Sequence, residues 1–170
     1  TLALGTDYTV TYDENTNVTD NAKVKISVNA KNYTGEIEKT FKILPKTISN
    51  IITLTAPVKN ETPQTSIKTD EYTAKVEWSP EVSDKFGYNK VYTAKITITP
   101  KANYTVKGID KDGYVIDGAK TVANAADSNI VTVEYAATGD KENNVFTVGL
   151  AIKGWTYGDT PNSPTATAKY

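Results

Sequence analysis

Alternation of apolar and polar residues over residues 91–99 is the feature that most constrains how this chain folds. The run reads VYTAKITIT and is followed by Pro100. Every second side chain from Tyr92 to Ile98 is apolar, whereas the residues between them are Thr or Lys. This period of two predicts a strand with one buried face, and the proline ends it because it has no backbone N–H to donate.

The composition extends this prediction to the whole chain. Thr, Val and Ile are abundant, and 11 Tyr accompany 3 Phe and 2 Trp. β-branched and aromatic side chains fit a pleated, half-buried surface better than a helix. An all-β protein is therefore expected over the 170 residues.

The absence of three residue types restricts the chemistry. The chain contains no His, Cys or Met, so the usual general base, the thiol nucleophile and the soft metal ligands are all missing. We therefore expect no enzymatic activity and no cofactor. The 19 basic residues, all lysine, are matched by 20 acidic ones for a net charge of -1. This balance provides no basic field for nucleic acid or for an anionic membrane.

Turn signals divide the chain into three segments. Residues 1–44 are expected to form a three-stranded meander with strands at 8–12, 22–30 and 36–43. Such a small sheet needs a partner to bury its apolar face. Leu44-Pro45-Lys46 then resembles a short linker, since proline does not pair within a central strand.

Residues 45–138 are expected to form one complete β-sandwich. Strand patterns recur there between turn signals, which is typical of sandwiches. The predicted strands are 49–55, 72–78, 91–99, 114–117 and 129–136. Trp78 alternates with apolar neighbours and is expected in the core.

Residues 139–170 are expected to form a further partial β module. The polar, charged run at 140–144 marks its boundary, and strands are predicted at 145–153 and 165–170. As the first and last segments both carry unpaired strand edges, we expect them to complement each other by strand addition, within a molecule or between neighbours.

An internal repeat connects the first two segments. Lys25-Ile-Ser-Val28 followed by Lys31-Asn-Tyr-Thr34 corresponds to Lys95-Ile-Thr-Ile98 followed by Lys101 and Asn103-Tyr-Thr105. The offset is about seventy residues, a spacing that tandem β modules would give.

The order of these motifs resembles that of tandem immunoglobulin-like repeats in bacterial, Gram-positive-type cell-surface proteins. The resemblance covers nearly the whole chain and rests on LGTDYTVTY at 4–12, KNYTG at 31–35, KTFKI at 39–43, the 72–105 stretch and GWTYGDTP at 154–161. It implies an immunoglobulin-like β-sandwich flanked by partial modules, with residues 1–44 as the C-terminal part of one repeat and residues 139–170 as the N-terminal part of a further repeat. The Asn17-Val-Thr19 turn departs from the family pattern, in which glycine is usual.

The resemblance also implies a function and a location. The expected function is that of a non-enzymatic structural or spacer module outside the cell, whose export signal and anchor lie outside these residues. Its expected partners are neighbouring β modules of the same parent protein. The alternative is an adhesin module that binds host glycan or protein, with Trp155 and Tyr157 as ligand or interface contacts.

Three further kinds of site have little support in the sequence. Asp110-Lys-Asp-Gly113 begins like a calcium loop but lacks the distal Glu, so a plain turn is the favoured interpretation. A Lys facing Asn or Asp could form an intramolecular isopeptide bond, and an intact mass without loss of water or ammonia would exclude it. Paired carboxylates for glycoside hydrolysis have no supporting motif.

Overall fold

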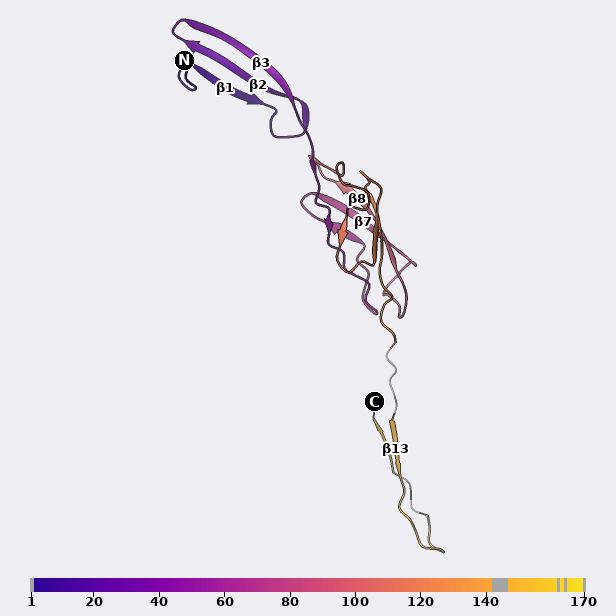
Figure 1. Cartoon of the computed structure of the whole chain (residues 1–170). Coiled ribbons are helices and arrows are strands. Elements are labelled where there is room, and N and C mark those ends of the chain that lie inside the picture. Colours follow the sequence, from indigo (N-terminus) through magenta and orange to yellow (C-terminus); the bar gives the residue numbers. More distant parts are fainter. Residues whose placement is uncertain (1, 142–146, 162, 164, 170) are drawn as a thin grey trace. The chain divides into compact units, whose positions relative to one another are not determined.

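The computed structural model describes the chain apart from residues 1, 142–146, 162, 164 and 170 (Figure 1). It divides into two compact units, residues 1–139 and 140–170. All regular structure in the described residues is β strand, which confirms the all-β prediction. In this part of the chain, no helix is long and apolar enough to cross a membrane.

The first unit opens with an antiparallel sheet of three strands in the order β1-β2-β3 (Figure 1). These are β1 (Tyr8–Asp13), β2 (Thr19–Ala30) and β3 (Tyr33–Ile43). The strands overlap the predicted ones, and β2 and β3 begin three residues earlier. A bulge between Thr19 and Ala22 shifts the register at the start of β2, so the early part of that strand breaks the alternation used to predict it.

A five-stranded antiparallel sheet forms the centre of the unit. The order is β11 (Thr121–Ala123), β12 (Ile130–Glu134), β8 (Thr93–Pro100), β7 (Tyr72–Ser79) and β6 (Ser66–Lys68). β8 contains the alternating run and lies in the middle, paired on both edges. Its Ala94, Ile96 and Ile98 are all 0% exposed, as the alternation predicts.

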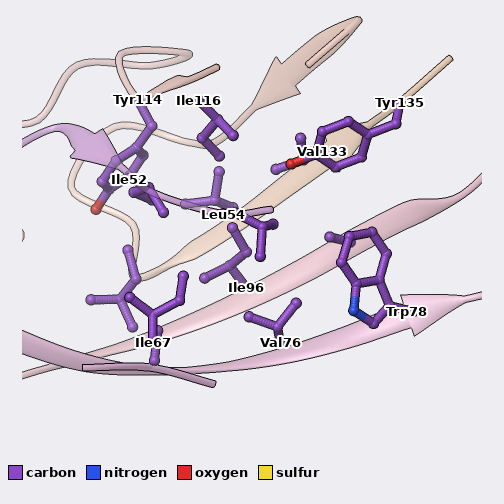
Figure 2. Close-up of a cluster of buried hydrophobic side chains, with 14 of the residues drawn as sticks. Ile52, Leu54, Ile67, Val76, Trp78, Ile96, Tyr114, Ile116, Val133 and Tyr135 are labelled. Carbon is purple, nitrogen blue, oxygen red and sulfur yellow. The ribbon is translucent and has the colours of Figure 1, made fainter. Parts of the chain in front are cut away.

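Two short parallel strand pairs complete this part of the chain, which we call the central body (residues 46–139). β4 (Lys46–Thr47) pairs with β9 (Tyr104–Thr105), and β5 (Ile51–Ile52) pairs with β10 (Val115–Ile116). Figure 2 shows Ile52 and Ile116 on the opposite side of the core from Ile67 and Val76 of the five-stranded sheet. The core-facing side of the five-stranded sheet is thus covered by these short strands and their flanking loops.

Aromatic rings fill one end of the core. The ring centroids of Trp78 and Phe86 are 5.0 Å apart, those of Phe86 and Tyr92 4.8 Å, and those of Trp78 and Tyr135 5.9 Å. The indole N–H of Trp78 donates to the Gln64 carbonyl at 2.8 Å, so its one polar atom is satisfied. The prediction that Trp78 belongs to the core is confirmed.

Most of the short strands were not predicted correctly, although β10 lies within the predicted strand 114–117. The expected strand 49–55 is reduced to β5, and the linker expected at Leu44-Pro45-Lys46 ends where β4 begins. β6, β9 and β11 have no counterpart in the prediction. A ladder of two or three residues shows no periodicity of its own, so only the tertiary pairing reveals it.

The second unit contains one antiparallel hairpin. β13 (Thr147–Ala151) pairs with β14 (Thr165–Lys169) in a register that places Gly149 opposite Thr167. Both lie within the predicted strands 145–153 and 165–170. Of the other predicted positions, 152 and 153 follow the end of β13, whereas 145, 146 and 170 lie outside the described residues.

Tyr135 provides a test of the core. Its side chain is 2% exposed, and its hydroxyl has no hydrogen-bond partner among the described residues. Burial raises the pKa of Tyr135 to about 12, from an ordinary value near 10. Tyr135→Phe removes only this unpaired hydroxyl, so the free energy of unfolding at neutral pH should be unchanged or higher.

The same variant should differ from wild type in alkali. Below about pH 10 the phenol is protonated in both states, whereas between about pH 10 and 12 it ionises only when unfolded, and the folded state loses stability. Tyr135→Phe should therefore retain about 1 kcal/mol more stability than wild type near pH 11. Urea unfolding at both pH values measures this difference, and a variant that is weaker at neutral pH would show that the hydroxyl has a partner.

Candidate functional site

The predicted contact residues Trp155 and Tyr157 lie between β13 and β14. Trp155 is 48% exposed and Tyr157 is fully exposed, next to a turn in which the Asp159 N–H donates to the Thr156 carbonyl at 3.0 Å. Neither ring contacts another aromatic ring within the described part of the chain. Both side chains are therefore accessible to solvent.

A hollow of about 320 Å³ lies elsewhere on the same hairpin. Its lining comes from Ala151, Ile152, Lys153, Ser163 and Thr165, and it excludes both predicted aromatic residues. The hollow therefore gives no support to a binding site built around Trp155.

The Asp110–Gly113 segment forms a turn that is tied to Asn124. The Gly113 N–H donates to the Asp110 carbonyl at 3.1 Å, and Asp112 has a φ of 54°. The Asp112 carboxylate accepts the Asn124 N–H at 3.1 Å, and the Asn124 amide donates to the Asp110 and Ala125 carbonyls. Asn124 is 7% exposed and acts as the polar centre of this loop.

These contacts give the carboxylate of Asp112 a structural role. No group of three or more His, Cys, Asp or Glu side chains able to hold a metal ion occurs in the described residues. The turn interpretation of the Asp-x-Asp-Gly motif thus accounts for its geometry without a cation.

The lysines that the structure describes do not have the environment that an isopeptide bond requires. The only polar residues buried in the described part of the chain are Asn124 and Thr138. A lysine must be shielded from water to attack an amide or carboxyl group, because its amine has to be neutral. Exposed lysines instead make ion pairs, as Lys75 does with Glu77 at 2.7 Å.

Polar side chains instead concentrate where the chain enters the central body. Asn103 has a φ of 70°, a left-handed conformation that Asn adopts more readily than most residues. Its carboxamide oxygen accepts the Val18 N–H at 2.8 Å, its amide group donates to the Asn17 carboxamide oxygen at 3.0 Å, and its backbone carbonyl accepts the Lys46 N–H at 2.9 Å. One residue thus connects the β1–β2 loop, β4 and the turn after β8, and we call this set the N-terminal junction.

Glu71 supports the N-terminal junction from the β6–β7 turn. Its carboxylate accepts the Ser49 N–H at 2.6 Å and the Lys46 ammonium at 3.0 Å. The Ser49 hydrogen bond, aided by the Lys46 ammonium, lowers the pKa of Glu71 below its ordinary value. The carboxylate stays charged and keeps the first residues of the body in place.

A second polar cluster lies where the chain leaves the body. Thr138 is 5% exposed, its hydroxyl donates to the Gly87 carbonyl at 2.7 Å, and the same oxygen accepts the Lys90 N–H at 3.1 Å. The Thr138 N–H donates to the Lys90 carbonyl at 2.9 Å, and the Asn89 N–H donates to the Gly139 carbonyl at 3.1 Å. We call these contacts the C-terminal junction.

The roles of Asn103, Asn124 and Thr138 were not predicted from the sequence. Asn103 belongs to the repeated Asn-Tyr-Thr motif, and an Asn within a turn is a signal for a left-handed conformation. Asn124 and Thr138 carry no such signal, because their partners lie in loops that are remote in sequence.

Comparisons of the chain with protein-family models, with curated proteins and with solved structures find no match.

The N-terminal junction can be tested at Asn103. Asn103→Gly keeps the left-handed backbone and deletes the carboxamide, so the Val18 N–H loses its acceptor. Loss of one hydrogen bond of about 1 kcal/mol should accelerate hydrogen exchange at the Val18 amide by about fivefold. The amides of β8 should be unaffected, and an unchanged Val18 rate would mean that the contact contributes nothing.

Proposed function

We propose that this chain is a non-enzymatic structural spacer of an extracellular, bacterial-type surface protein, with an immunoglobulin-like central body between two smaller β modules. Its partners are the neighbouring β modules of the same parent protein. The proposal draws on the resemblance of the sequence motifs to cell-surface repeats. One structural observation also supports it, namely where the two junctions lie on the central body.

The two junctions lie at opposite ends of β8. The N-terminal junction is built on Asn103, which follows the strand end at Pro100, whereas the C-terminal junction is built on Lys90, which precedes the strand start at Thr93. Eight residues of antiparallel strand span about 27 Å. The chain therefore enters the central body near one end of β8 and leaves it near the other, about this length apart.

Both junctions also restrain the chain at its points of attachment. The carboxamide of Asn103 holds the β1–β2 loop, and the hydroxyl of Thr138 holds the segment that leaves the body. Backbone groups that are fixed by side chains have fewer accessible conformations than those of a plain linker. Such restraint suits a spacer better than a flexible tether would.

The surface is consistent with long exposure outside the cell. The chain has no cysteine or methionine to oxidise. All of its cationic side chains are lysines, which suit solvated strand faces and discourage edge-to-edge pairing. These properties support the proposed location but say nothing about a particular ligand.

The spacer proposal predicts a fixed distance across the central body. Cysteines introduced as Lys90→Cys and Ala102→Cys would be the only thiols in the chain and can carry two spin labels. A dipolar electron resonance measurement should give one narrow distance distribution, at about 30–40 Å including the label arms. A broad distribution, or a distance under about 20 Å, would contradict a rigid spacer.

The second candidate is an adhesin module, and one observation favours it. Trp155 and Tyr157 are large aromatic side chains two residues apart, and both are open to solvent. Exposed aromatic rings are common anchors for sugars and for protein surfaces. Glycan or protein binding through this pair would give the second unit a role beyond spacing.

A binding measurement decides between the candidates. The spacer proposal expects no signal above background on arrays of host glycans and host surface proteins, and equal results for wild type and for the double variant Trp155→Ala, Tyr157→Ala. The adhesin candidate expects binding that falls at least tenfold in the double variant, about 1.4 kcal/mol. Val115→Ala, an exposed residue of the first unit, is the matched control.

A further inference from the structure

One face of the β1–β2–β3 sheet is apolar. The strand register and the alternation of side chains along each strand agree on which residues lie on this face. Lys39 is the only charged one among them. The members are Tyr8, Val10 and Tyr12 of β1, Ala22, Val24, Ile26, Val28 and Ala30 of β2, and Tyr33, Gly35, Ile37, Lys39, Phe41 and Ile43 of β3. We call it the apolar face.

The opposite face of the same sheet is built for water. Lys23 pairs with Glu38 at 3.0 Å, and Lys25 pairs with Glu36 at 2.8 Å. The hydroxyl of Ser27 donates to the same Glu36 carboxylate. The sheet therefore has one solvated face, and an antiparallel sheet with this pattern normally buries the other.

Four large side chains of the apolar face are nevertheless exposed in the structure. Tyr33 is 67% exposed, Tyr12 59%, Ile37 54% and Phe41 37%. The sheet contains 6, 12 and 11 residues in its three strands, which at ~3.4 Å by ~4.8 Å each cover roughly 470 Å². An apolar patch of this size is comparable to the largest patch of a typical monomer, which is often functional.

The β13–β14 hairpin is too small to cover this face. Its two strands of five residues cover roughly 160 Å², about a third of the apolar face. A layer of matching size is a second sheet of three strands. The apolar face is therefore matched in size by a second sheet like its own.

We propose that the apolar face pairs with the same face of a second copy of this chain, which closes a two-layer sandwich between two molecules. The two-fold axis is parallel to β2 and lies midway between the two sheets. It therefore places β1 of each copy over β3 of the other. Sheets packed in this way lie about 10 Å apart with their strands rotated by roughly 30°. The contact is isologous, because each copy contributes the same residues.

Side-chain size across the sheet selects this axis. Tyr8, Val28 and Gly35 form one row, since Tyr8 pairs with Val28 and Val28 with Gly35. The two-fold operation reverses the row and places the large ring of Tyr8 over Gly35 of the partner subunit. Close packing of two layers needs large residues opposite small ones, and this row provides it at both edges.

The single charge also fits this arrangement. Tyr12, Val24 and Lys39 form another row, which places Lys39 over Tyr12 of the partner subunit at the rim of the sandwich. A lysine at that position packs its alkyl chain on apolar surface and extends its ammonium into water. The ammonium can also contact the tyrosine ring, an attractive cation–π geometry.

The paired faces bury on the order of 1,000 Å² in total, the lower bound for a specific interface. We therefore expect a reversible dimer whose population rises with concentration. Sedimentation equilibrium of the full chain over a concentration series should show a mass that increases towards twice the monomer value. A mass that stays at the monomer value at every concentration overturns the proposal.

Substitutions on the two faces of the sheet locate the interface. Ile37→Asp places a charge on the apolar face and should weaken dimerisation at least tenfold. Thr11→Asp places the same charge on the opposite face, across from Lys25, and should leave the dimer intact. Equal dimerisation by both variants overturns the proposal, and circular dichroism checks that each variant keeps its β structure. If Ile37→Asp loses that structure, Tyr33→Ser removes an exposed ring of the apolar face instead and should weaken the dimer.

Two more variants test the axis and the occupant. Ile37 of one copy lies over Val10 of the partner subunit, since both share a row with Ile26. Adding Val10→Lys to Ile37→Asp should recover at least a few-fold of the lost affinity through two new ion pairs, and no recovery overturns the axis. Leu150→Asp changes only the hairpin. If this variant abolishes dimerisation while Ile37→Asp does not, the hairpin is the occupant and the proposal is wrong.

Discussion

The central body depends on the hydrogen bonds that β8 exchanges with β7 on one edge and with β12 on the other. This double pairing aligns Val76, Ile96 and Val131 in one buried row across three strands. It also places Ala94 between Trp78 and Val133, where its small side chain leaves room for the indole ring. The short parallel strands and the aromatic end of the core pack against a surface that these pairings create.

The strands that were predicted correctly are those in which apolar side chains alternate with a period of two. β7, β8 and β12 show alternation over five or more residues and were placed within one or two residues of their observed bounds. β4 and β9 contain two residues each, and nothing in their own letters distinguishes them from loop. Their pairing follows the turn at Asn103, whose carbonyl accepts the Lys46 N–H. The missed strands are therefore products of tertiary structure.

The candidate site, too, could be predicted from the sequence only in part. Exposure of Trp155 and Tyr157 could be guessed from a Gly- and Pro-rich context, although their role stays a prediction. The junctions could not be found from the sequence, because Asn103 and its partner Val18 are 85 residues apart. A polar residue becomes a junction only when the fold brings an unpaired backbone group within reach, and a single sequence does not encode that distance.

The parallel pairing of β4 with β9 has a mechanical consequence. When tension acts on the chain at both ends of the central body, β4 is drawn along its own length past β9. The Lys46 and Ile48 N–H groups, bonded to the Asn103 and Thr105 carbonyls at 2.9 Å, are then loaded together in shear. Bonds that share a load resist it jointly, whereas a peeled hairpin breaks them one at a time. Within the pairing of β4 with β9, these two bonds therefore share the load when the central body is pulled at both ends.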